Sequence, residues 1–129
     1  MTNVQNLLPH LVVNDAPAAI DFYVKAFDAK EEMRLPGPDG RIIHAAISLG
    51  GHMVMLVEEF PEMGGKSPRT LGGSPVTIHL NVTDADAAVA QAAAAGAKVA
   101  MPVEEQFWGD RYGMIEKIRS AISGPSLTR

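Results

Sequence analysis

One segment of the chain occurs twice. Residues 10–20 (HLVVNDAPAAI) and residues 79–89 (HLNVTDADAAV) are identical at seven of eleven positions. Two copies are too few for a stack of repeats, which needs at least three units to bury a continuous core. We therefore expect a single domain made of two copies of one supersecondary unit, related by pseudo-two-fold symmetry, with a site between the copies.

The first copy predicts a strand, a helix and three more strands. Leu7–Val13 has the branched apolar residues of a buried strand, and the Asn14-Asp15 pair suits the start of a helix. Further strands are expected at 31–35, 41–49 and 52–57, and Gly50-Gly51 is typical of a hairpin turn between the last two. The predicted unit is βαβββ, and the predicted fold class is α+β.

The second copy follows the same order less completely. The pattern predicts a strand at 76–82, a helix at 85–95, and strands at 98–103 and 109–116. Residues 117–129 show neither strand alternation nor β-rich composition, so we expect the last strand to be missing and a short amphipathic helix to end at Gly124-Pro125. The predicted organisation is one domain, 1–129, with module one at about 5–59, a linker at 60–74, module two at 75–116 and an atypical tail at 117–129.

Composition narrows the classes of function. The chain has 129 residues, a formal net charge of −4 and no cysteine. This charge favours neither nucleic acid nor an anionic membrane as a partner. The lack of cysteine excludes disulfides and thiolate chemistry. No apolar run reaches membrane-spanning length, and no signal segment is evident, so we predict a cytoplasmic protein.

Four segments resemble one family. HLVVNDAPAAIDFY (10–23), LPGPDG (35–40), EFPEMG (59–64) and QFWGDRYG (106–113) are similar to the PhnB-like branch of the glyoxalase/bleomycin-resistance/dioxygenase superfamily, also called the vicinal oxygen chelate fold. The resemblance covers 7–116. It implies two βαβββ modules that form a curved mixed sheet around a cavity, often in a homodimer. Members include metal-dependent isomerases, dioxygenases and metal-free drug-binding proteins.

The resemblance also indicates which positions of this chain would hold the family's metal ion. Three of the family's four metal-ligand positions fall on Leu8, Ala46 and Thr77, which lack the imidazole or carboxylate donors that first-row divalent metals favour. The usual site is therefore expected to be absent. His10, His44 and His79 lie two residues from those positions, so strand alternation can place all three on the cavity side. They form either a shifted metal site or a wall of hydrogen-bonded histidines.

An aromatic loop provides a second candidate. Trp108, the only tryptophan, and Tyr112 flank Arg111 in the segment 107–113. The rings can stack a planar ligand while Arg111 holds an anionic group, or the loop is a packed turn with an Asp110–Arg111 pair. The methionines on predicted strands fill the core or line an apolar pocket; they are Met53, Met55, Met101 and Met114.

The tail departs from the family pattern. After Tyr112-Gly113 the family has a strand that begins Asp-Pro-Phe-Gly-His, where this chain has KIRSAISGPS at 117–126. Codons exist for these residues that encode Asp-Pro-Phe-Gly-His-Leu-Trp-Ser-Val when they are read from the third base. We therefore infer that a frameshift replaced the last strand, which sequencing of the encoding DNA tests.

Two classes of function remain open from the sequence. One is a metal-independent small-molecule-binding protein, with no cofactor and with a ligand held by residues from both modules: His10, His44, His79, Trp108, Arg111 and Tyr112. The alternative is a metal-dependent lyase, isomerase or dioxygenase that uses a divalent metal in the shifted histidine site. A chain inactivated by the loss of its last strand is a third interpretation. The expected partners are a small-molecule ligand and a second copy of the chain.

Overall fold

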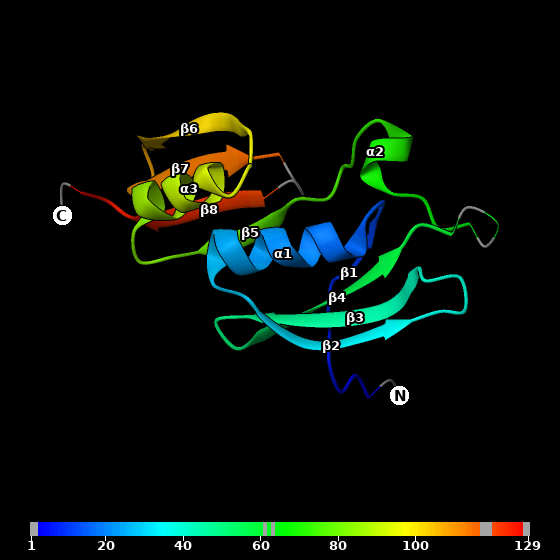
Figure 1. Cartoon of the computed structure of the whole chain (residues 1–129). Coiled ribbons are helices and arrows are strands. Elements are labelled where there is room, and N and C mark those ends of the chain that lie inside the picture. The colour runs from blue at the N-terminus through cyan, green and yellow to red at the C-terminus, as the bar shows by residue number, and fades with distance from the viewer. Residues whose placement is uncertain (1–2, 61, 63, 117–119, 128–129) are drawn as a thin grey trace. The chain divides into compact units, whose positions relative to one another are not determined.

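The computed structural model describes residues 3–60, 62, 64–116 and 120–127. It divides into two compact units, Met1–Val24 with Asp28–Gly73, and Lys25–Phe27 with Ser74–Arg129. The elements of module one are β1 (His10–Val13), α1 (Ala16–Phe27), β2 (Lys30–Pro36), β3 (Ile42–Leu49) and β4 (His52–Glu58). Those of module two are β5 (Ile78–Asn81), α3 (Ala85–Ala94), β6 (Val99–Glu105), β7 (Asp110–Ile115) and β8 (Ser120–Pro125), and a short helix, α2 (Pro68–Leu71), precedes β5 (Figure 1).

The two modules have the same topology. The sheet of module one has the strand order β1-β4-β3-β2, and that of module two has the order β5-β8-β7-β6. In each sheet the first strand pairs in parallel with the last, and the remaining pairs are antiparallel. The predicted α+β class and the two βαβββ units are confirmed. Among the described residues no helix is long and apolar enough to cross a membrane.

Local sequence signals set the ends of the elements. Asp15 caps α1 by accepting a hydrogen bond from the Ala18 N–H, and Asp84 caps α3 in the same way. Gly50 and Gly51 both have positive φ, 55° and 84°, which is the backbone of a two-residue hairpin turn that glycine adopts without strain. The repeated segment therefore specifies a strand followed by a capped helix in both modules.

The core of module one lies on one side of its sheet. Ala45 and Ile47 of β3 and Leu56 of β4 are fully buried, as is Ile20 of α1. Glu58, at the end of β4, accepts hydrogen bonds from the backbone N–H groups of Ala16 and Ile42. One carboxylate thus joins the start of α1 to two strands.

The expectation that the last strand is missing was wrong. Ser120–Pro125 forms β8 in the middle of the second sheet, where it pairs with β5 on one side and β7 on the other. Consequently β5 does not lack a partner along its inner edge. The predicted tail helix is also wrong for 120–125, while residues 117–119, where it would begin, lie outside the described residues. The frameshift concerns the gene and stays a hypothesis.

Small side chains explain why these residues form a strand. Residues 120–123 (Ser-Ala-Ile-Ser) are buried on both faces of the sheet, so the strand needs compact side chains rather than an alternating pattern. Gly124 lies against the start of α3: a Cβ there would meet the Val82 carbonyl oxygen at 3.0 Å and the Ala85 nitrogen at 3.2 Å. Glycine thus permits a close approach of helix and strand.

A carboxylate fixes the end of β8. Glu105 accepts hydrogen bonds from the Ser126 hydroxyl (2.9 and 3.0 Å) and from the Leu127 N–H (2.9 Å). The Ser126 hydroxyl, the Leu127 N–H and the charge of Arg111 together hold the pKa of Glu105 below its ordinary value of 4.5. The residues that follow the strand are therefore held to β6.

We predict that Gly124→Ala destabilises the protein by about 1–3 kcal/mol, because its methyl group would push β8 away from the start of α3. The matched control is Gly65→Ala, since a Cβ on Gly65 meets its neighbours only at ordinary contact distances of 3.6–4.0 Å. Urea denaturation measures both variants. Equal stability of the two variants would contradict this placement of β8.

We also predict that the stabilisation by Glu105 depends on pH. A lowered pKa means that the ionised carboxylate stabilises the folded state above pH 4.5, and that this contribution is lost as the pH falls through the lowered pKa. The difference in unfolding free energy between the natural protein and Glu105→Gln should be largest near neutral pH and shrink as the pH falls below 4.5 and through the lowered pKa. A difference that stays constant between pH 7 and pH 3 would refute this role.

Candidate functional site

The two faces of the second sheet have different roles. Ile115, Ser120 and Ile122 are fully buried on the face against which α3 packs. The opposite face, which we call the open face of module two, carries His79, Asn81, Tyr112 and Ser123. Asn81 and Tyr112 are both register partners of Ser123, so three neighbouring strands place these side chains in one row.

A chain of hydrogen bonds crosses this row. The Ser123 hydroxyl lies 2.8 Å from Nε2 of His79 and donates to Oδ1 of Asn81, also at 2.8 Å. A hydroxyl has one proton, so Ser123 must accept from His79, and Nε2 of the neutral ring carries the proton. Ser123 is 6% exposed. The buried serine therefore orients the imidazole and leaves the lone pair of Nδ1 for another partner.

Three aromatic rings continue from His79 into the loop before β7. The ring of Tyr112 lies 6.0 Å from that of His79 and 6.1 Å from that of Trp108, between centroids. Phe107 packs edge-on against Trp108 at 5.0 Å. Trp108 is 50% exposed and Phe107 is 98% exposed. Large aromatic rings are usually buried, so these two form an exposed apolar surface beside a polar row.

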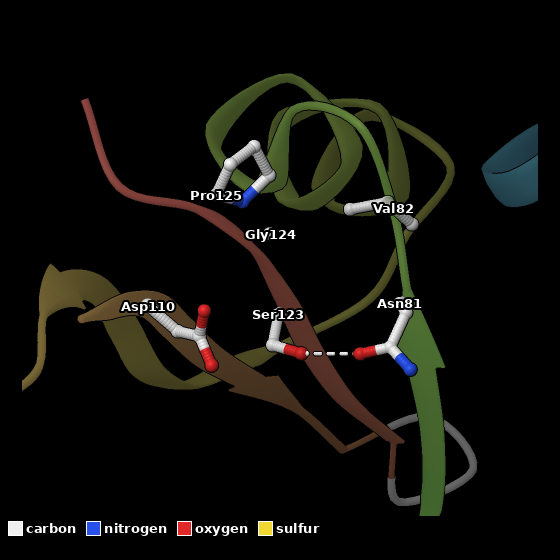
Figure 2. Close-up of a pocket in the computed structure, with 6 residues that line it drawn as sticks. All are labelled: Asn81, Val82, Asp110, Ser123, Gly124 and Pro125. Atoms are coloured by element: carbon white, nitrogen blue, oxygen red, sulfur yellow. Dashed lines mark hydrogen bonds between the residues drawn. The ribbon is translucent and has the colours of Figure 1, made fainter. Parts of the chain in front are cut away.

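A hollow of about 280 Å³ opens at the end of the polar row (Figure 2). Figure 2 shows Asn81, Ser123 and Asp110 around it on three neighbouring strands. Among the described residues no side-chain hydrogen bond or ion pair engages the Asp110 carboxylate. The hollow therefore combines a carboxylate acceptor with the amide N–H groups of Asn81, which suits a ligand group that both donates and accepts hydrogen bonds. Its lining is Asn81, Val82, Asp110, Ser123, Gly124 and Pro125.

Arg111 does not join Tyr112 on the open face. Its guanidinium binds both carboxylate oxygens of Asp86 on α3, at 2.7 and 3.0 Å, and lies 3.7 Å from Glu105. The hydrogen bonds from Arg111 lower the pKa of Asp86, and Asp86 raises that of Arg111. Arg111 thus fastens α3 to the sheet, and the predicted Asp110–Arg111 pair is replaced by Asp86–Arg111.

The structure brings together two of the three candidate histidines. His10 and His44 lie on β1 and β3 of module one, with ring centroids 6.2 Å apart. His79 belongs to module two. In the described parts of the chain no group of three or more His, Asp or Glu side chains is placed to hold a metal ion. The shifted three-histidine site, with its divalent metal, stays a prediction.

The usual metal positions of the resembled family do not suit a metal. Leu8 and Ala46 have no donor atom, and Thr77 has only a hydroxyl. Strand β8, on which the fourth position falls, has the sequence Ser-Ala-Ile-Ser-Gly-Pro and therefore offers no imidazole or carboxylate. These residues do not fit a site for a first-row divalent metal.

The sequence patterns missed Asn81, Asp110 and Ser123. Asn81 lies two residues after His79, so alternation along β5 could have placed both on one face. Ser123 was hidden because its segment was not predicted to be a strand. Asp110 was assigned to a local pair with Arg111.

The sequence and the fold both match known proteins. The model of the Glyoxalase/Bleomycin resistance protein/Dioxygenase superfamily matches residues 5–126. The uncharacterized proteins Rv0887c of Mycobacterium tuberculosis and Mb0911c of Mycobacterium bovis are 61% identical over 112 residues. This region is 84% of this chain, but 66% and 74%, respectively, of theirs.

Solved structures share the fold. A gene product from Arabidopsis thaliana is 25% identical, with a TM-score of 0.75 over 96% of this chain and 100% of that one. TioX from Micromonospora sp. ML1 is 23% identical, with a TM-score of 0.72 over 95% of this chain and 99% of that one. A PhnB protein from Bacillus cereus is 14% identical, with a TM-score of 0.70 over 92% of this chain and 98% of that one.

We predict that neutral His79 is protonated on Nε2, because its partner Ser123 donates its only proton to Asn81. Long-range ¹H–¹⁵N correlation spectra of the imidazole measure this directly. Ser123→Ala should weaken the preference of His79 for protonation on Nε2. Ser48→Ala, a matched change in module one, should leave the His79 signals unchanged. A wild-type His79 protonated mainly on Nδ1 would contradict the hydrogen-bond chain.

Proposed function

Because the chain belongs to the Glyoxalase/Bleomycin resistance protein/Dioxygenase superfamily, we propose that it is a small-molecule-binding protein that holds its ligand on the open face of module two. The observation that carries the proposal is the hydrogen-bonded row of His79, Ser123 and Asn81 beside exposed aromatic rings. Ligand sites typically combine an apolar surface with a few fixed polar groups.

The arrangement favours a ligand with a planar apolar part. Trp108 is half-exposed, so a flat ring of a ligand can stack on its exposed part. A polar substituent of the same ligand can reach the hollow, where Asp110 accepts and Asn81 donates hydrogen bonds. The free nitrogen of His79 provides a further acceptor.

The charges on the open face of module two restrict the charge of the proposed ligand. Among the residues that form the four strands β5, β6, β7 and β8, the only lysine or arginine is Arg111, which Asp86 already engages on the other face. Glu104 lies on the open face because it is the register partner of Tyr112. Asp110 lies on the same face because it is two residues before Tyr112 on β7. We therefore propose a neutral or cationic ligand rather than an anion.

The homodimer follows from the family alone, and the location follows from the sequence alone. A homodimer and a cytoplasmic location stay predictions, as does a contribution of His10 and His44 to the same ligand. The chain spans 66% to 74% of the length of its mycobacterial relatives, so the activity of such longer proteins is not assigned to it.

We predict that a planar cation such as proflavine changes the fluorescence of Trp108 in a saturable way, with EDTA present to exclude metal. Trp108 is the only tryptophan, so the signal reports on this loop alone. A planar anion such as anthraquinone-2-sulfonate should bind more weakly because of Glu104 and Asp110.

Calorimetric measurement of proflavine binding to two variants provides the control for this experiment. Trp108→Ala should weaken proflavine binding by about three- to tenfold, the free energy of one aromatic contact. Phe60→Ala, which removes a ring packed on Arg41 in module one, should have no effect. Unchanged affinity in Trp108→Ala, or no saturable binding of either compound, would refute the proposed site.

A further inference from the structure

The open face of module one carries a different set of side chains. His10 on β1 pairs with Met55 on β4, Met55 pairs with Ala46 on β3, and Ala46 pairs with Met33 on β2. These four residues form one row across the sheet. The neighbouring residue Leu56 is fully buried on the opposite face, where the core lies. The row therefore presents an imidazole and two thioethers on the same side.

A second histidine reaches this row. His44 lies on β3, separated from β1 by the whole of β4, yet its ring centroid is 6.2 Å from that of His10 and the rings are nearly perpendicular at 88°. Residues two strands apart have backbones about 9–10 Å apart, so both rings must lean over β4 to come this close. Met55 on β4 is the register partner of His10 and also of Ala46, which lies two residues along β3 from His44.

The separation of the rings suits one shared ion. Metal–nitrogen bonds to imidazole are about 2.0–2.1 Å, so two rings on one ion have centroids roughly 5 to 6 Å apart. The observed 6.2 Å needs only a small side-chain rotation to reach this range. Ala46, beside Met55 in the row, adds no bulk that would block the approach.

The chemistry of these donors selects the ion. Two imidazoles and a thioether are neutral, and thioethers favour soft ions such as Cu(I) over Mg²⁺, Ca²⁺ or Mn²⁺. One acidic side chain on this face, Glu32, is held by Ser48 and Lys30 at the other end of β3. Among the described residues no third His, Asp or Glu completes a site for a divalent cation.

We propose that the open face of module one binds one soft monovalent metal ion, Cu(I) in chemical class, through His10, His44 and Met55. This site uses none of the family's usual positions and none of the residues on the open face of module two. Its test is therefore separate from that of the ligand site proposed there, although the sequence also predicts that His10 and His44 contact a ligand.

Competition against a Cu(I) chelator under reducing conditions tests the proposal. The wild-type protein should bind one equivalent of Cu(I), and Met55→Leu should weaken the affinity by at least about tenfold while keeping the apolar volume. Met101→Leu is the matched control, because it makes the same change on a strand of module two. Zn²⁺ should bind far more weakly than Cu(I).

If Met55→Leu fails to fold, a spectroscopic measurement on the wild-type protein still tests the proposal. Addition of Ag(I), a redox-stable probe, should shift the methyl signal of Met55 and the imidazole signals of His10 and His44. The signals of His79 and Met101 should stay in place. The proposal would be overturned if the wild-type protein did not bind one equivalent of Cu(I), or if it bound Zn²⁺ with equal affinity. It would also be overturned if Ag(I) left the methyl signal of Met55 unchanged.

Discussion

Strand β8 is the element on which module two depends. It pairs with β5 in parallel and with β7 in antiparallel register, so it supplies the connection between the repeated strand and the rest of the sheet. Its two faces serve different purposes. Ile122 is buried on the side of α3, while Ser123 on the open face supports His79. Without this strand the histidine would lose its hydrogen-bond partner and β5 would lose its neighbour.

The modules share a topology but fasten their helices differently. In module one, Glu58 bonds the start of α1 to the sheet, whereas the equivalent position in module two is occupied by Gly124, against which α3 lies closely. The ion pair between Asp86 and Arg111 then holds α3 to β7. The contacts that fasten each helix thus lie on the helix side of its sheet, and the two open faces carry different side chains.

Much of the fold was predictable because its signals are local. The repeated segment, the Asn14-Asp15 pair at the start of α1 and the Gly50-Gly51 turn act over a few residues, and all are found where the patterns predict them. Strand β8 was not predictable in this way. A central strand is buried on both faces, so residues such as Ser120 and Ala121 are selected by the space between neighbours that lie far away in the sequence.

The candidate site was predictable only in part for the same reason. His79, Trp108 and Tyr112 stood out as chemically distinctive residues, and the structure places their rings in succession. The role of Ser123 depends on β8, and the role of Arg111 depends on Asp86, which lies 25 residues away on a helix. The type of a residue alone does not show which distant side chain it will contact in the folded protein.

Amide hydrogen exchange across 120–125 tests the central claim most directly. If β8 lies between β5 and β7, the amides of Ala121, Ile122 and Ser123 should be protected as strongly as those of β7, because both strands open only when the module unfolds. Exchange of these amides at the rate of an unstructured chain, with β7 still protected, would show that β8 does not form and would remove the support for His79.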